Sequence, residues 1–192
     1  MESQTSSPAS SPASSRARPR PPLDEAKLGE LAVHYVGRFA TSRARLVTYL
    51  RRKLNERGWA GAHPADPGAV AERLAGLGYI DDAAYAAAKG RALGSRGYGA
   101  RRVASALYAA GIEEDDRGEA MAAAEAGKVA AALRFAERKR IGPYARAAVE
   151  PATREKSIAA MIRAGHGFPL ARAIAGLAPG TVPDPEGLSN IR

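Results

Sequence analysis

The chain of 192 residues contains no cysteine, a single tryptophan and few other aromatic side chains. Without cysteine there can be no disulfides, no thiolate nucleophiles and no thiolate-bound zinc. No apolar run approaches the roughly 20 residues that a membrane-spanning helix needs. The first residues also lack the apolar stretch of a signal peptide. We therefore expect a cytoplasmic protein with no role at a membrane.

Valine and isoleucine are sparse and never alternate with polar residues, so no stretch predicts a β-strand. Alanine supplies much of the apolar fraction. Because small side chains each bury little area, we expect thin hydrophobic cores that depend on their neighbours. The sequence predicts an all-α fold.

Apolar spacing and end signals predict nine helices. The first five cover about residues 24–40, 42–57, 66–77, 82–93 and 99–110. A sixth starts in the acidic run at residues 113–116 and passes Met121, and the last three cover about 126–140, 151–164 and 169–177.

The second and fifth of these helices end alike, each at a glycine followed by a bulky apolar residue. The pairs are Gly58 with Trp59, and Gly111 with Ile112. Such a glycine can take the left-handed conformation that closes a helix, with the next side chain buried against it. A looser copy, "MIRAGHGF", ends the eighth helix. The recurrence predicts three tandem three-helix repeats in an elongated, curved, solenoid-like row.

We divide the chain at the ends of these repeats. Residues 1–23 are rich in serine and proline and are predicted to be a disordered tail. Residues 24–80, 81–125 and 126–178 are the three repeats, and residues 179–192 are a flexible tail. We expect a monomer.

A net charge of +9 favours an acidic partner, above all nucleic acid. The middle segment carries no excess of positive charge, which argues against DNA wrapping along the whole chain and leaves room for a protein partner. The candidate cations form two clusters, and solvated helix surface is the alternative interpretation of both. They are Arg51, Arg52 and Lys53 in "RRKLNER", and Arg96, Arg101 and Arg102 in "GSRGYGARR".

The glycine-rich stretch that holds Gly97 and Gly99 precedes a helix, as a phosphate-binding loop would. No strand comes before it and no nucleotide-binding pattern matches, so we interpret it as a tight turn between helices. Asp81 and Asp82 could bind a metal, but the more economical interpretation is that Asp81 caps the fourth helix and Asp82 complements its dipole. We find no catalytic, metal or cofactor site and expect a protein that is not an enzyme.

The stretch "GYIDDAAYAAAKGRALGSRGYGARRVASALYAAGI" resembles the central signature of the RecX family, bacterial regulators of the RecA recombinase. Gly78 opens it, the two aspartates and the glycine-punctuated turn follow, and Gly111 with Ile112 closes it. "LRRKLNERGW" and "AMIRAGHGF" resemble the first and third repeats of that family, so the similarity covers about residues 28–177.

This resemblance implies three three-helix repeats and a protein without catalytic activity or cofactor. It also implies binding to RecA filaments, with limits on filament growth, ATP hydrolysis and strand exchange in DNA recombination, repair and the SOS response. Single-stranded DNA would be contacted directly or through the filament.

Two other functions stay open. A helix-turn-helix protein could act directly on DNA, although its recognition helix should present polar base-reading side chains where this chain offers mostly arginine, lysine and alanine. A helical scaffold for an unrelated acidic protein is equally compatible with the composition.

Overall fold

A computed structural model describes residues 20–191 of the chain. Its regular elements are helical, and the extended segments meet only in one bridge between Leu23 and Trp59. The all-α prediction is confirmed. The elements are α1 (Glu25–Arg38), α2 (Arg43–Arg57), α3 (Pro67–Gly76), α4 (Asp82–Ser95), α5 (Ala100–Ala109), α6 (Glu114–Ala126), α7 (Lys128–Lys139), the 3-10 turn η1 (Gly142–Tyr144), α8 (Pro151–Arg163), α9 (Phe168–Gly176) and α10 (Pro185–Ser189).

The first four helices begin in the same way. A side-chain oxygen of the residue before the helix accepts the N–H group three residues further on, which satisfies a donor that has no partner inside the helix. Each such cap stabilises a helix by about 1 kcal/mol. The capping residues are Asp24, Ser42, Asp66 and Asp81.

Three hydrophobic cores follow one another along the chain. The first joins α1, α2 and α3 around Leu46 and Leu50, and the second joins α4, α5 and α6 around Val103 and Leu107. The third joins α7, α8, α9 and α10, with Met161 at its centre. Alanines fill much of the second core, so α4 and α6 approach closely with little apolar area between them.

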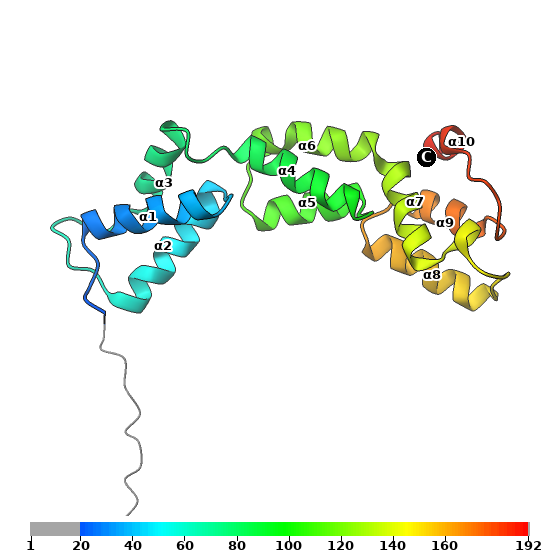
Figure 1. Cartoon of the computed structure of the whole chain (residues 1–192), viewed down its shortest axis with the longest axis horizontal. Coiled ribbons are helices and arrows are strands. Elements are labelled where there is room, and N and C mark those ends of the chain that lie inside the picture. The colour runs from blue at the N-terminus through cyan, green and yellow to red at the C-terminus, as the bar shows by residue number, and fades with distance from the viewer. Residues whose placement is uncertain (1–19, 192) are drawn as a thin grey trace, which may run out of the picture.

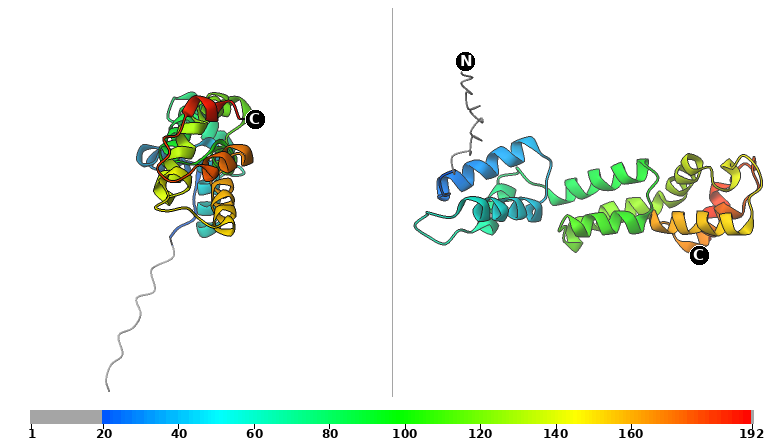
Figure 2. Two further views of the ribbon diagram at one scale, coloured as in Figure 1. Left: turned by 90° about the vertical axis from the view of Figure 1, so that its right-hand side faces the viewer. Right: turned by 90° about the horizontal axis from the view of Figure 1, so that it is seen from below.

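The three groups of helices stand in a row that bends into an arch (Figure 1). Helices α2, α5 and α8, the second helix of each group, lie along its concave lower side. In the left view of Figure 2, along the row, α2 (cyan) and α8 (gold) lie at the bottom of the helical part. The row thus presents a long, shallow surface built from one equivalent helix per group.

The predicted N-terminal tail extends too far. Most of it lies outside the described residues, but its last residue, Leu23, is fully buried in the first core. The N–H group of Leu23 donates to the carbonyl of Gly58 (3.0 Å), and its own carbonyl accepts from Ala60 (2.8 Å). The guanidinium of Arg57 also donates to the carbonyl of Pro21. Residues 20–23 therefore belong to the first group of helices.

Residues 179–192, predicted as a flexible segment, contain a short helix in the part that the structure describes. Asp184 caps α10, and Leu188 inserts into the third core. The N–H group of Gly180 also donates to the carbonyl of Pro143 (2.9 Å). Helix α10 has only five residues, too few for an apolar periodicity to be recognised in the sequence.

Candidate functional site

The first and second groups of helices meet where α5 ends and α2 begins, a contact that we call the first joint. The hydroxyl of Ser42, at the start of α2, donates to the carbonyl of Ala110, at the end of α5 (2.6 Å). Gly111 follows with a φ of 68°, and a methyl group there would collide with Ala44. The two helix ends are therefore in direct contact.

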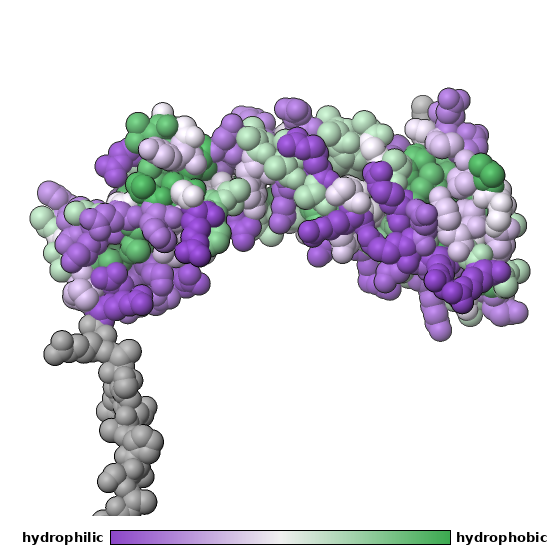
Figure 3. Space-filling view, in the orientation of Figure 1, coloured by the Kyte–Doolittle hydropathy of each residue, from purple (hydrophilic) through white to green (hydrophobic). Residues whose placement is uncertain are grey.

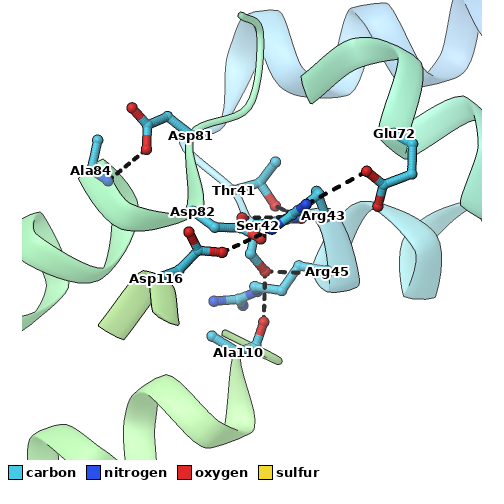
Figure 4. A network of polar contacts seen from close by, with 10 residues as sticks. All are labelled: Thr41, Ser42, Arg43, Arg45, Glu72, Asp81, Asp82, Ala84, Ala110 and Asp116. Carbon is cyan, nitrogen blue, oxygen red and sulfur yellow. Dashed lines mark hydrogen bonds and ion pairs between the residues drawn. The ribbon is translucent and has the colours of Figure 1, made fainter. Parts of the chain in front are cut away.

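Arg43 holds the first joint together (Figure 4). Its Nε donates to Oδ2 of Asp82 (2.9 Å) and its Nη2 to Oδ2 of Asp116 (2.8 Å), while its backbone N–H reaches Oδ1 of Asp82 (3.0 Å). A longer contact of 3.5 Å joins it to Glu72. The hydrogen bond to Asp82 raises the pKa of Arg43, so the guanidinium is charged. One side chain thereby links α2 to α3, α4 and α6.

The two adjacent aspartates have different roles. Asp81 caps α4 as predicted, because its Oδ1 accepts from the N–H of Ala84 (2.7 Å). The carboxylate of Asp82 is only 3% exposed and forms an ion pair with Arg43. Its role is therefore not limited to the predicted complement of the dipole of its own helix. Both carboxylates of the pair therefore have partners within the chain.

The second joint connects the middle group to the third and is made of backbone. The N–H of Gly99 donates to the carbonyl of Ala164 at the end of α8 (2.9 Å). A methyl group on Gly99 would collide with the carbonyl oxygen of Gly165. One on Gly97 would lie 2.8 Å from the backbone nitrogen of Phe135. The glycine-rich stretch is the predicted inter-helix turn, and it also lets two backbones touch.

His166 fills the second joint. Its side chain is buried, and its Nε2 lies 3.0 Å from the carbonyl of Gly97. Because a carbonyl only accepts, Nε2 carries the proton. Burial lowers the pKa of His166, and the hydrogen bond to Gly97 only partly opposes this, so the imidazole is neutral at pH 7. The sequence showed an isolated histidine and gave no sign of this contact.

The predicted helix closures differ among themselves. After α5 the N–H of Ile112 returns to the carbonyl of Leu107, and after α8 the N–H of His166 returns to that of Met161 (3.1 Å each). Both are the same left-handed closure. Gly58 has the predicted positive φ (79°), but its ψ of 175° lies outside the left-handed helical region. Trp59 is accordingly half-buried, where we predicted a buried side chain.

One relationship nevertheless unites all three helices on the concave side. The carbonyl of the residue that closes each helix accepts a hydrogen bond from a segment outside that helix. The carbonyl of Ala164, after α8, accepts from the N–H of Gly99. The carbonyl of Ala110, after α5, accepts from the hydroxyl of Ser42. The carbonyl of Gly58, after α2, accepts from the N–H of Leu23. Helices α8, α5 and α2 consequently follow one another end to end along the arch.

The first predicted basic cluster lies in the last two turns of α2. Arg51 and Arg52 are exposed. The side chain of Lys53 is only 20% exposed, and its ammonium lies 2.6 Å from Oε2 of Glu56. Glu56 also contacts Arg52 at 3.6 Å. Arg51 and Arg52 are thus the accessible cations of this cluster, whereas Lys53 is already partnered.

The second predicted cluster surrounds the second joint. Arg96, Arg101 and Arg102 are exposed. The carbonyl of Arg96 accepts from the guanidinium of Arg138, whose carbon lies 5.9 Å from the ring centre of Tyr98. The structure does not bring the two clusters together, because α5, roughly 15 Å long at 1.5 Å per residue, lies between them. Hydrophilic side chains line the lower edges of both ends of the arch (Figure 3).

No described helix combines the length and the apolar character that a bilayer crossing requires.

The relative and the solved structures that resemble the chain agree with one another. No family model matches the chain. The chain is 30% identical over 168 residues to a protein of Myxococcus xanthus (strain DK1622) named regulatory protein RecX, covering 82% of this chain and 88% of the relative. Two solved structures share its fold. The crystal structure of RecX from Lactobacillus salivarius gives a TM-score of 0.60 at 18% identity, over 78% of this chain and 92% of that one. A second crystal structure, of regulatory protein RecX, gives a TM-score of 0.58 at 19% identity, over 78% of this chain and 70% of that one.

Proposed function

Because the chain belongs to the RecX family of regulatory proteins, we propose that it binds filaments of the RecA recombinase on DNA and limits their growth, ATP hydrolysis and strand exchange. Membership of the family carries this proposal. The protein acts by binding and has no catalytic step of its own.

The shape of the molecule supports binding to a filament. Three equivalent helices placed end to end form a surface that is long and shallow, with one repeat of structure after another. Such a surface matches a polymer of identical subunits better than it matches a small molecule, which needs an enclosed pocket. Exposed arginines near the end of α2 and at the start of α5 offer charge to acidic protein surface or to phosphate.

The test is the ATPase activity of a RecA recombinase on single-stranded DNA, measured with increasing amounts of the full chain. We expect inhibition that is stronger when the chain is present during filament assembly than when it is added afterwards. Equal activity with and without a saturating amount of the chain would refute the proposal.

A DNA titration separates this mechanism from direct action on DNA. If the chain acts by occupying naked DNA, as a helix-turn-helix protein would, excess single-stranded DNA restores the ATPase activity. If it acts on the filament, inhibition persists at a fixed ratio of chain to recombinase. A scaffold for an unrelated acidic protein would leave the activity unchanged at every DNA concentration.

A further inference from the structure

A groove of about 550 Å³ lies between the first and second groups of helices. Its floor is a row of alanines on α5, whose short side chains leave the space open. Polar and aromatic side chains from three other helices form the walls. Tyr35 comes from α1, Arg45, Thr48, Tyr49 and Arg52 from α2, and Lys89 from α4.

The walls of this groove are positively charged and contain no carboxylate. Arg45 donates to the hydroxyl of Tyr85 (2.8 Å), a neutral partner that leaves its charge uncompensated. Lys89 forms no ion pair with any residue between 20 and 191. Arg52 has only its 3.6 Å contact with Glu56, at an exposed position. Three cations that converge on one groove create a positive potential that attracts an anionic ligand.

The same groove has an aromatic wall. The rings of Tyr35 and Tyr49 are stacked, with centroids 4.2 Å apart and planes inclined by 18°. The guanidinium carbon of Arg52 lies 5.7 Å from the centre of the Tyr49 ring. Both tyrosines are only partly buried, so part of the stacked pair faces the groove. The wall is formed before any ligand binds.

We propose that this groove binds a segment of single-stranded nucleic acid, with phosphates on Arg45, Arg52 and Lys89 and a base against the tyrosine pair. Cations that follow the backbone, together with aromatic rings that stack on bases, are the usual means of binding a single strand. In a duplex the bases are stacked on one another and cannot reach the rings. An acidic peptide would use the cations and leave the tyrosines without a role. The inference extends the proposed function, since a filament assembled on DNA offers such a strand.

The first test measures binding of a fluorescein-labelled oligothymidine to the full chain by fluorescence anisotropy, without any recombinase. The triple variant Arg45→Gln, Arg52→Gln, Lys89→Gln should bind at least tenfold more weakly at low salt. The slope of the logarithm of the binding constant against the logarithm of the salt concentration should become less steep by about 2. Each phosphate contact to a single strand contributes about 0.7 to that slope. The matched control removes three exposed cations outside the groove by Lys27→Gln, Lys156→Gln and Arg172→Gln, and it should bind within about twofold of wild type.

The second test addresses the aromatic wall. Tyr49→Phe keeps the stacked ring and should bind like wild type, whereas Tyr49→Leu should lose about tenfold because a base loses its stacking partner. Oligonucleotides that carry 5-iodouracil form photochemical cross-links to stacked aromatic residues. Applied to the wild-type chain, they should attach to Tyr35 or Tyr49, a readout that does not depend on any variant being folded.

Three results would overturn the inference: wild-type affinity in the triple variant, cross-links confined to residues outside the groove, or equal affinity for duplex of the same length. Displacement of the oligonucleotide by polyglutamate at equal charge, with no effect of Tyr49→Leu, would assign the groove to acidic peptides instead. Because these assays contain no recombinase, they can fail while inhibition of the RecA ATPase persists, and the reverse also holds.

Discussion

The hydroxyl of Ser42 donates a hydrogen bond of 2.6 Å to the carbonyl of Ala110, 68 residues further along the chain. The same oxygen accepts the N–H of Arg45 (3.2 Å), so one side chain serves the start of α2 and the end of α5 together. Removing it by Ser42→Ala should lower the free energy of unfolding by about 1–2 kcal/mol, measured by urea denaturation. Asp24→Ala, which removes a cap without a cross-joint bond, should cost about 1 kcal/mol. A smaller loss for Ser42→Ala than for Asp24→Ala would contradict a role in the joint.

Replacement of Arg43 by methionine should destabilise the chain by about 3 kcal/mol, because it leaves the buried carboxylate of Asp82 without its cation. Arg51→Met, at an exposed position on the same helix, serves as the control and should stay within about 0.5 kcal/mol of wild type. Chemical denaturation of both variants at pH 7 makes the comparison. Similar values for the two would mean that the Arg43 network contributes nothing to stability.

Two glycine-to-alanine substitutions should change the stability of the chain in opposite directions. Gly99 has an ordinary φ of −82°, but a methyl group there meets the backbone of Gly165. Gly99→Ala should therefore cost about 1–3 kcal/mol through overpacking. Gly94 lies within α4 with no atom within 4 Å of the added methyl group, so Gly94→Ala should stabilise by up to about 1 kcal/mol. Thermal unfolding would show a lower and a higher midpoint respectively, and a neutral Gly99→Ala would contradict the tight backbone contact.

A chain that begins at residue 24 should be less stable than one that begins at residue 20. The shorter chain lacks Leu23, whose buried side chain should be worth about 2–5 kcal/mol, as for other deletions of a buried leucine. It also loses both backbone hydrogen bonds around Trp59. Equal melting temperatures for the two truncations would show that the predicted tail boundary at residue 23 was right after all.

Stability should fall as the pH decreases from about 7.5 to about 5.5. The folded chain holds the pKa of His166 below the value of 6.5 expected when unfolded, so near pH 6 the unfolded state binds more protons. The stabilising contribution of the neutral His166 is complete above the pKa of the unfolded state. It is lost as the pH falls through the lower pKa of the folded state. His166→Asn keeps a donor for Gly97 and should weaken the pH dependence. His34→Asn, at an exposed position on α1, is the matched control.

Charge reversal should separate the two basic clusters. Arg51→Glu with Arg52→Glu should weaken binding to filaments and to naked single strands, because Arg52 also lines the groove. Arg101→Glu with Arg102→Glu should weaken binding to filaments only. At these exposed positions each substitution should change stability by about 0.5 kcal/mol or less. Co-sedimentation with filaments and anisotropy with oligonucleotides provide the two readouts, and unchanged filament binding by both variants would exclude these residues as the site.

The sequence predicted nine of the helices to within a few residues, since their caps and apolar spacing are local signals. It failed where a contact spans distant segments. The partner of Asp82 lies 39 residues earlier, and the carbonyl that His166 contacts lies 69 residues earlier. No periodicity reports such pairs.

The ends of the concave-side helices also depend on contacts that the local sequence does not show. Gly58 and Gly111 have the same local sequence pattern, yet Gly58 takes a different ψ because Leu23 pairs beside it. Conversely, the looser "AGHGF" forms the regular closure, because His166 acts as the buried residue that follows the glycine. A pattern of glycine and apolar residue predicts that a helix ends, whereas the segment packed against it decides how the chain leaves.

The hydrogen bond between Leu23 and Gly58 closes the row of concave-side helices at its N-terminal end. In the other two cases the carbonyl that closes a concave-side helix accepts a hydrogen bond from the start of the concave-side helix of the preceding repeat. At Gly58 that acceptor is occupied by the chain itself. A duplicated repeat inserted before α1 would have to displace Leu23, and so would a second molecule that approached end-on to extend the row into a polymer. We therefore expect that an added repeat and end-to-end association of two molecules would both require the segment around Leu23 to leave Gly58.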